Sequence, residues 1–211
     1  MKKIALLFSL SMAVCLPNLF SQKNDDWMKL FNGTFDNWKV GENAATFKTE
    51  DGMIVVNGPT AHLFYDGDYS NHDFRNFELK LDIMTTPGSN SGVYIHTKYQ
   101  ESSWPQVGYE IQVNNSHTDW RRTGSVYGIQ DVKDVYVKDN EWFTMDITVQ
   151  GKHVVVKIND KVINDYTEPA NVQREKGDEQ RVLSHGTFAL QGHDPKSKVY
   201  YKNIMVRTLP D

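Results

Sequence analysis

Two short segments, Ser91–Thr97 and Gly108–Asn114, contain residue types that could perform chemistry. Both alternate apolar and polar residues with a period of two, which predicts strands with one face in a core. The side chains of interest on their exposed faces are Tyr94, His96, Glu110 and Gln112. If the strands are neighbours in one sheet, a carboxylate, an imidazole, an amide and an aromatic ring share one surface. Such a set could bind and cleave a sugar, although two amphipathic strands with incidental polar residues would give the same pattern.

A third segment, Thr187–His193, alternates in the same way and would place Gln191 and His193 on one face. We predict that these two side chains join the polar face of the first two strands. His193 is then a candidate catalytic residue. The alternative is that His193 only makes local hydrogen bonds in the loop at Asp194 and Pro195.

The elements that must position these residues are short strands separated by Gly, Asn, Asp and Pro. Hairpin turns are predicted at Glu50–Gly52 and Gln150–Lys152, with a further turn at Asn159 and Asp160. The expected strands are Thr46–Thr49, Met53–Val56, His62–Tyr65, Phe77–Met84, Gly92–Thr97, Tyr109–Val113, Val126–Ile129, Trp142–Gln150, His153–Ile158, Lys161–Tyr166, Thr187–Gln191 and Val199–Arg207. This pattern predicts an all-β protein, a two-sheet antiparallel sandwich of the jelly-roll type.

The long segments between the strands would form loops at the rim of the sandwich, where function is common. Two of them contain Trp104 and Trp120, whose rings could stack on sugars or simply cover a sheet edge. The charged tract Gln173–Arg181 is expected to be a mobile exposed loop. The candidate substrate-binding residues are Tyr94, Gln112, Trp104, Trp120, Arg121, Tyr127 and Gln191.

The first 21 residues read as a secretory signal. Lys2 and Lys3 precede an apolar run, Ile4–Leu16, that is short for a membrane span, and the small residue Ser21 offers a cleavage site. Residues 22–211 would then form one exported domain, periplasmic or secreted. The single cysteine, Cys15, lies within the signal, so the mature chain would fold without disulfides. Lipid anchoring at Cys15 is the alternative.

Charge and hydropathy exclude some partners. The formal net charge of the 211 residues is −4, and it falls to about −6 without Lys2 and Lys3. No basic run is longer than Arg121-Arg122, so a nucleic-acid partner is not expected. No apolar segment after the signal approaches the length of a transmembrane span. The sequence does not determine the oligomeric state.

Eight short motifs, in order and at natural spacing, resemble the 3-keto-disaccharide hydrolase domain of bacterial exported proteins. They are Phe31–Gly33, Asn76–Leu79, Pro87–Tyr94, Gly108–Gln112, Thr123–Gly128, Glu141–Trp142, Ala189–His193 and Tyr201–Ile204. The resemblance covers essentially the whole mature chain and implies a concanavalin A-like sandwich. It also implies a carbohydrate substrate that carries a ketone at C3, made by a separate oxidoreductase. Two departures are Ser125, where the family tends to have Ala, and His96, where Arg is frequent.

The acidic residues argue against an ordinary retaining glycosidase. Sandwich glycosidases of the laminarinase type carry acids on one strand as E-x-D-x-x-E, and retaining enzymes use two carboxyls roughly 5–5.5 Å apart. Here the strand offers Glu110, but Gln112 and Asn115 follow where the further acids would be. A 3-keto sugar needs less, because the carbonyl acidifies the C2 proton and one base can expel the glycosidic oxygen by elimination.

We therefore predict that Glu110 is the base of this reaction and that His96 and His193 are further catalytic residues. No close-spaced metal motif is present, so no cofactor is expected; a divalent ion held by His96, His193 and Glu110 to polarise the ketone is an alternative. A buried acid stabilised by Arg121 or Arg122 would look identical in sequence. The alternative function is a non-catalytic carbohydrate-binding module of the same fold.

Overall fold

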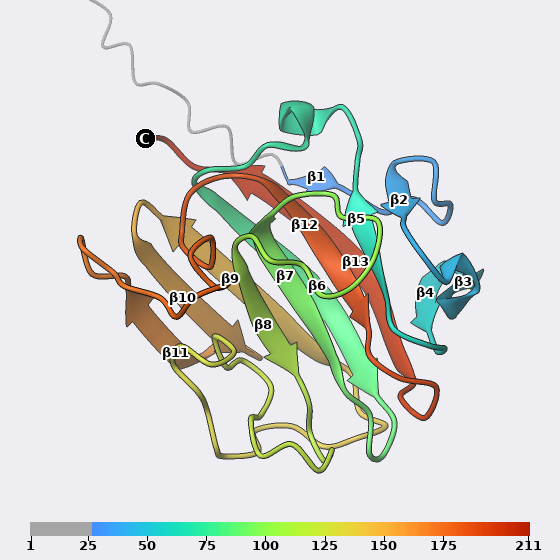
Figure 1. Ribbon diagram of the computed structural model, residues 1–211. Helices are drawn as coiled ribbons and strands as arrows, with labels where there is room; N and C mark the ends of the chain where they lie inside the picture. The colour runs from blue at the N-terminus through green and yellow to red at the C-terminus, as the bar shows by residue number, and fades with distance from the viewer. Residues whose placement is uncertain (1–26) are drawn as a thin grey trace, which may run out of the picture.

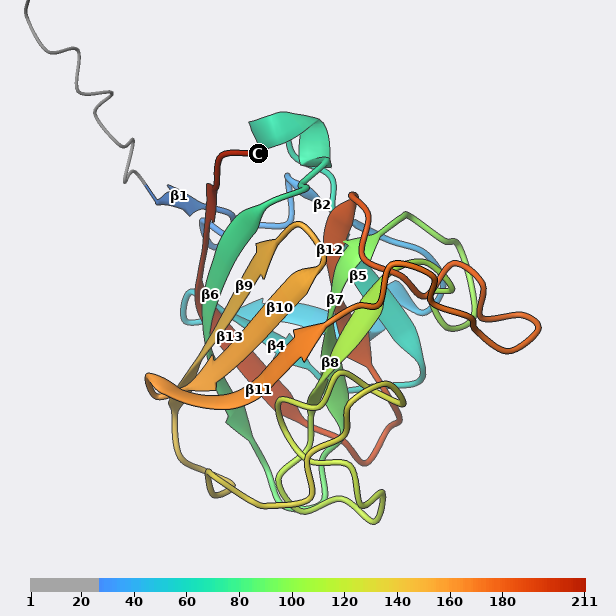
Figure 2. The same ribbon diagram turned by 90° about the vertical axis from the view of Figure 1, so that its left-hand side faces the viewer.

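A computed structural model describes residues 27–211, which form two antiparallel sheets packed face to face (Figures 1 and 2). In spatial order, the larger sheet contains β11 (Lys161–Thr167), β10 (His153–Ile158), β9 (Phe143–Gln150), β6 (Phe77–Thr85), β13 (Val199–Thr208), β4 (Met53–Val56) and β3 (Phe47–Glu50), with β1 (Met28–Lys29) paired to β13. The smaller sheet contains β2 (Trp38–Val40), β5 (Ala61–Tyr65), β12 (Thr187–Gly192), β7 (Ser91–Thr97) and β8 (Tyr109–Val113). The predicted sandwich is confirmed.

The expected signal segment, residues 1–21, and Cys15 lie outside the described residues. Two short 3-10 helices, Ala44–Thr46 and Tyr69–His72, occur among residues 27–211. No helix of that part of the chain is long and apolar enough to cross a membrane.

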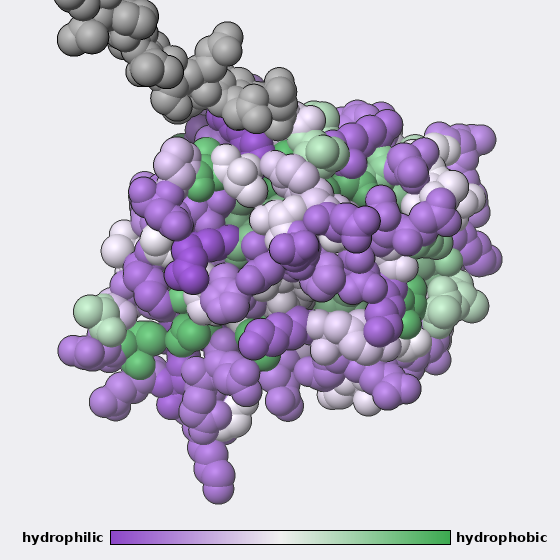
Figure 3. All heavy atoms as spheres, turned by 90° about the horizontal axis from the view of Figure 1, so that it is seen from above, coloured by the Kyte–Doolittle hydropathy of each residue, from purple (hydrophilic) through white to green (hydrophobic). Residues whose placement is uncertain are grey.

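The core between the sheets is formed by strands in which buried and half-buried residues alternate. In β6, Phe77, Leu79 and Leu81 are buried while the residues between them are half-buried. Val93 of β7 and Ile111 of β8 are fully buried from the other side. The face of the molecule seen in Figure 3 is mostly hydrophilic, with hydrophobic side chains only in small groups. Apolar burial between the two layers is therefore the main stabilising term.

The predicted turns are confirmed by backbone conformation. Asp51 and Gly52 have φ of 49° and 74°, and Asn159 and Asp160 have φ of 48° and 64°. Gly151 likewise has φ of 59°. These left-handed conformations favour Gly, Asn and Asp, the residues that mark the turns in the sequence.

Three elements differ from the sequence prediction. The two- and three-residue strands β1 and β2 were too short to show a period of two. The predicted strand Val126–Ile129 is a turn, because the N–H groups of Ile129 and Gln130 both donate to the Val126 carbonyl at 2.9 Å. Only isolated bridges link Val126 to Ile111 and Gln130.

The smaller sheet brings together the three strands that carry the candidate residues. β8 pairs with β7, Tyr94 opposite Glu110, and β7 pairs with β12, Tyr94 opposite Ala189. The predicted neighbourhood of these strands is confirmed. Because the opposite face of this sheet packs into the core, their polar residues project together from its outer face.

Candidate functional site

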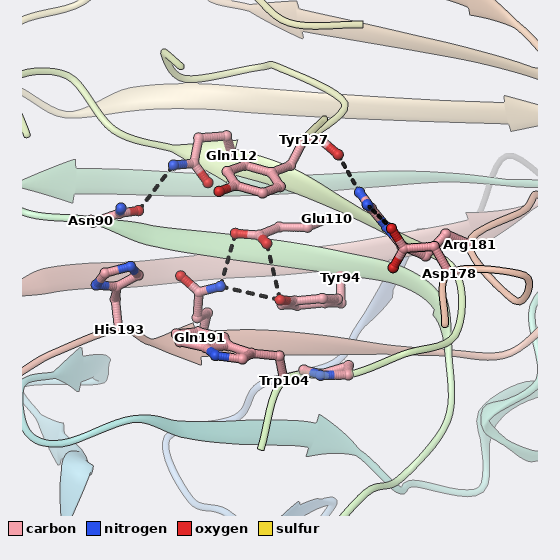
Figure 4. A pocket seen from close by; sticks show the side chains of 12 residues that line it. Asn90, Tyr94, Trp104, Glu110, Gln112, Tyr127, Asp178, Arg181, Gln191 and His193 are labelled. Carbon is pink, nitrogen blue, oxygen red and sulfur yellow. Dashed lines mark hydrogen bonds and ion pairs between the residues drawn. The ribbon is translucent and has the colours of Figure 1, made fainter. Parts of the chain in front are cut away.

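A cavity of about 260 Å³ lies over the outer face of β12, β7 and β8 (Figure 4). Small-molecule pockets span about 300–1,000 Å³, and this cavity lies just below that range. Its size therefore suits one sugar ring better than a long oligosaccharide. The lining residues are Asn90, Tyr94, Trp104, Pro105, Gly108, Glu110, Gln112, Tyr127, Asp178, Arg181, Gln191 and His193.

Glu110 lies at the centre of the cavity wall and is held by two donors from neighbouring strands. The Tyr94 hydroxyl donates to Glu110 Oε2 at 3.0 Å, and the Gln191 Nε2 donates to Glu110 Oε1 at 2.8 Å. Gln191 Nε2 also lies 3.2 Å from the Tyr94 hydroxyl, which closes a triangle of hydrogen bonds. Figure 4 shows this triangle facing the cavity. The carboxylate is therefore fixed in position before any ligand enters.

A glycine makes room for this carboxylate. Gly92 of β7 is opposite Gln112 of β8, next to the Tyr94–Glu110 pair. A Cβ at Gly92 would lie 2.3 Å from Glu110 Oε1, closer than any real contact. The absence of a side chain at this position therefore lets the Glu110 carboxylate lie across β7 and reach Gln191.

Burial raises the pKa of Glu110 to about 7, while the hydrogen bonds from Tyr94 and Gln191 and the positive charge of Arg181 oppose the rise. Near neutral pH both protonation states are then populated, which suits a residue that must accept a proton and return it. Burial also raises the pKa of Tyr94 well above its ordinary value, so its hydroxyl stays protonated and donates.

Two amide oxygens in the cavity wall have no protein partner. Gln112 Oε1 and Gln191 Oε1 are buried and accept no hydrogen bond from any described residue. Gln112 is held through its other atom, because Nε2 donates to Asn90 Oδ1 at 3.0 Å. Buried acceptors without donors are costly, so these oxygens are ready to receive hydroxyl groups of a ligand.

One wall of the cavity is aromatic. Trp104, 43% exposed, lies with its ring centre 5.5 Å from that of His193 and 5.6 Å from that of His62. His62 is buried beneath it and also contacts the Tyr94 ring, 5.3 Å away. Burial lowers the pKa of His62 to about 4, so its ring is neutral where it packs against Trp104 and Tyr94.

His193 follows β12 and lines the same cavity. The Asp194 carboxylate and the His117 imidazole lie next to it. The Nδ1 of His193 lies 2.8 Å from Asp194 Oδ2, and its ring centre lies 5.5 Å from that of His117. One ligand-type atom of each of these three residues lies within 4.8 Å of the others. Among the described residues, this is the group whose composition and spacing could hold a metal ion.

The predicted placement of His96 is wrong because β7 contains a bulge. Thr97 pairs with Thr187 and Tyr94 with Ala189, so two residues of β7 stand opposite one of β12. His96 has φ of 53°, and the alternation that would place it beside Tyr94 is broken there.

The His96 ring is instead fully buried against Phe77, with ring centres 5.6 Å apart. Its Nδ1 accepts from the Ser184 N–H at 3.0 Å, and its Nε2 donates to the Arg75 carbonyl at 2.9 Å. Burial lowers its pKa to about 4. Both nitrogens are thus occupied, so His96 links backbone segments, and the predicted metal set of His96, His193 and Glu110 is not brought together.

Two other predicted residues lie outside the cavity lining. Trp120 is 46% exposed and contacts the guanidinium of Arg121, 5.0 Å from its ring centre. Arg121 pairs with Asp131 at 3.2 Å and lies 4.7 Å from the Tyr127 ring centre. Arg121 therefore supports a lining residue from behind, and Trp120 is a surface ring.

The positive charge that acts on Glu110 belongs to Arg181, in the loop that we predicted from the sequence to be mobile and exposed. Arg181 lines the cavity, donates to the Tyr127 carbonyl and lies 3.4 Å from Asp178 Oδ2. The tract Gln173–Arg181 is thus part of the site. Other lining or supporting residues missed from the sequence are Asn90, His62 and His117. The local hydrogen bond considered for His193 is formed with Asp194, and His193 lines the cavity as well.

Solved structures share this fold at low identity. A protein from Parabacteroides distasonis ATCC 8503, proposed to be a glycosyl hydrolase, is 23% identical, covers 87% of this chain and 94% of its own, and has a TM-score of 0.73. The carbohydrate-binding module CBM66 from Bacillus subtilis is 12% identical, covers 86% and 99%, and has a TM-score of 0.56. At these identities the likeness establishes the fold.

Sequence comparison is more specific. The 3-keto-disaccharide hydrolase of Bacteroides thetaiotaomicron is 27% identical over an alignment of 172 residues, with 67% of this chain and 59% of the relative covered. The chain thus spans less than two thirds of that relative's length. Residues 26–207, nearly all of the described part, match one family throughout. The chain belongs to the family of 3-keto-alpha-glucoside-1,2-lyase-like domains.

Proposed function

We propose that this protein cleaves the glycosidic bonds of 3-keto-glycosides by base-assisted elimination followed by hydration, with Glu110 as the base. Family membership and the name of the Bacteroides relative support a glycoside hydrolase-like role. The observation that carries the proposal is the Glu110 carboxylate, fixed in a sugar-sized cavity with a pKa of about 7.

The reaction needs one residue that accepts the C2 proton and later returns it. Glu110 removes the C2 proton, which the C3 ketone acidifies. The C–H electron pair forms a C1–C2 double bond, and the C1–O bond breaks with its electrons on the glycosidic oxygen. Water then adds its OH to C1, and the proton that it loses balances the one that the departing oxygen takes up. Glu110 returns its proton to C2. Because a single carboxylate serves both steps, the absence of a second acid at Gln112 does not prevent this chemistry.

The rest of the cavity can hold the sugar. The partnerless oxygens of Gln112 and Gln191 would accept from sugar hydroxyls, and Trp104 offers a ring face to sugar C–H groups. The Arg181 guanidinium, whose charge already acts on Glu110, would stabilise the negative charge that develops on the enolate.

The direct experiment is incubation with a 3-keto-disaccharide and, as the matched control, with the same disaccharide unoxidised, each with and without a chelator. We expect cleavage of the keto form alone, unaffected by the chelator. Binding of either sugar without cleavage would contradict the proposal and favour a carbohydrate-binding module.

The pH profile should report the ionisation of Glu110. Because the base must be ionised and the pKa of Glu110 is about 7, we expect kcat/KM to fall tenfold per pH unit below about pH 7 and to level off above it. Initial rates from pH 5 to 9 on 3-keto 4-nitrophenyl glucoside, whose leaving group departs without a proton, test this. A rate that stays level down to pH 5, as expected for a carboxyl of ordinary pKa 4.5, would show that the reacting group is not this carboxylate.

Gly92→Ala should impair the reaction without unfolding the protein. The new methyl group would displace the Glu110 carboxylate and break its bonds to Tyr94 and Gln191, while the fold needs only a side-chain shift. A displacement of about 1 Å can cost about 10²-fold in rate, and we expect a loss of that order in kcat. Thermal unfolding is the control, and full activity would show that the observed carboxylate position is not the reactive one.

A further inference from the structure

The hydrogen bonds around His193 fix its tautomer. The Asp194 carboxylate accepts from the Lys196 N–H and the Ser197 hydroxyl, each at 2.8 Å, and lies 2.8 Å from His193 Nδ1. These bonds keep the pKa of Asp194 at about 2 against the opposing effect of burial, so the carboxylate is ionised and can only accept. His193 Nδ1 must therefore carry the proton, and Nε2 carries the lone pair.

The neighbouring His117 has the opposite tautomer, with its proton on Nε2. The backbone N–H of Asp119 lies 3.1 Å from His117 Nδ1, and a backbone N–H can only donate. The Asn90 amide nitrogen lies 3.4 Å from the same atom. Nδ1 is therefore the acceptor and the proton is on Nε2. The loop is held in this geometry by Arg122, which donates to the His117 carbonyl at 2.9 Å.

These opposite tautomers suit proton transfer better than metal binding. A metal ion requires a lone pair from each imidazole, and ligating histidines direct their other N–H to an acceptor. His117 lacks that arrangement, because its lone pair already receives the Asp119 N–H. His193 has an imidazole–carboxylate pair of the kind that positions and stabilises a proton-transferring histidine.

We propose that His193 is the acid that protonates the departing glycosidic oxygen, and that Asp194 acts through it as a positioning residue. This role rests on the proposed function. His193 lines the cavity that contains Glu110, and its side chain is 30% exposed, so water can reach its ring. The negative charge of Asp194 stabilises the imidazolium, which then carries a proton on Nε2 while Nδ1–H remains bound to the carboxylate.

The protons balance over one cycle. Glu110 accepts the C2 proton as the C1–C2 double bond forms, and the glycosidic oxygen leaves with the proton from His193 Nε2. When water adds to C1, His193 Nε2 takes the proton that water loses, and Glu110 returns its proton to C2. The net change is the addition of one water across the glycosidic bond, and both residues regain their initial states.

The tautomers can be read directly by nitrogen-15 NMR of the imidazole rings at neutral to mildly alkaline pH. We expect Nδ1–H at His193 and Nε2–H at His117. His153 is the internal control, because its Nε2 lies 2.6 Å from Asp165 Oδ1, far from the cavity on the larger sheet. Asp194→Asn should change the His193 spectrum, and Asp165→Asn only that of His153. A His193 ring with an unprotonated Nδ1 would overturn the proposal.

Leaving-group dependence tests the catalytic role. An acid matters for a sugar leaving group and little for 4-nitrophenolate, which departs without a proton. His193→Gln should therefore slow cleavage of a 3-keto-disaccharide by about 10²-fold or more and cleavage of 3-keto 4-nitrophenyl glucoside by less than about tenfold. Asp194→Asn should show the same pattern to a smaller degree, and Asp165→Asn should change neither rate.

The outcomes separate this role from the proposed function. If His193→Gln loses the same fraction of the cleavage rate on both substrates, and Glu110→Gln is also slowed on both, the role of His193 is overturned and the role of Glu110 stands. No cleavage of either substrate by the wild-type protein would refute the proposed function and this role with it. Zinc or manganese binding in calorimetry that is lost in both His117→Ala and His193→Ala would overturn the proposal in favour of a metal site.

Discussion

Glu110→Gln should lower kcat/KM for a 3-keto-disaccharide by about 10²- to 10⁴-fold, the usual contribution of a general base. The amide can occupy the same space between Tyr94 and Gln191, and Gln191 can rotate its partnerless oxygen toward the new donor. The cavity should therefore keep its shape and its affinity for the sugar, so the loss should appear in kcat more than in KM.

The same substitution should stabilise the fold above neutral pH. The pKa of Glu110 is about 7 in the folded chain and 4.5 in its ordinary state. The carboxyl group therefore costs nothing below about pH 4.5, becomes increasingly unfavourable to folding up to about pH 7, and has a constant cost above it. A rise of that size corresponds to at most about 3.5 kcal/mol. We expect Glu110→Gln to raise the free energy of unfolding by up to about that amount at pH 8, and little at pH 4.

Urea unfolding at pH 4 and pH 8 tests this, with Glu50→Gln, at an exposed residue of β3, as the matched control. Equal stability of Glu110→Gln and wild type at both pH values would mean that Glu110 is solvated in the folded state. In that case its carboxylate would lack the raised pKa on which the account of the base depends.

Glu168→Ala should destabilise the protein, because it leaves the Leu183 N–H and the buried Tyr109 hydroxyl without their acceptor, at a cost of about 1–3 kcal/mol for each group. The buried Glu168 carboxylate accepts from Lys152 Nζ at 2.7 Å, from the Leu183 N–H at 2.8 Å and from the Tyr109 hydroxyl. These partners outweigh burial and lower the pKa of Glu168. Its contribution is therefore present above the ordinary carboxyl pKa and is lost as pH falls through the lowered value.

This network also connects stability to the site. Glu168 begins the loop that carries Asp178 and Arg181 to the cavity, and Tyr109 precedes Glu110 on the opposite face of β8. Urea unfolding of Glu168→Ala at neutral pH measures the effect. Lys152→Met is the control and should cost less than about 1 kcal/mol, because Lys152 is half-exposed and the other partners of the carboxylate remain. Similar costs for the two variants would show that Glu168 is not the centre of the network.

Period-two alternation was sufficient to predict the sandwich and the faces of its long strands. It placed Tyr94, Glu110 and Gln191 correctly because each belongs to a regular stretch of strand. It failed at His96, where one extra residue in β7 reverses the face, and nothing in the sequence around His96 distinguishes a bulge from a regular strand.

Loop residues were the least predictable part of the site. Arg181 reaches the cavity only because the loop after β11 is tied back by Glu168, and His117 does so because Asn114 and Arg122 hold its loop. These contacts form within irregular loops, between residues 3 to 15 positions apart, and neither periodicity nor residue type reveals them. Trp120 illustrates the converse, since an aromatic residue in a rim loop can remain on the surface.

Turnover of a 3-keto-disaccharide labelled with deuterium at C2 tests most directly whether Glu110 breaks the C2–H bond. We expect the labelled substrate to react more slowly than the unlabelled one under single-turnover conditions, because Glu110 must break the C2–D bond. Equal rates for the two substrates would contradict this role, because the glycosidic bond would then break without removal of that proton.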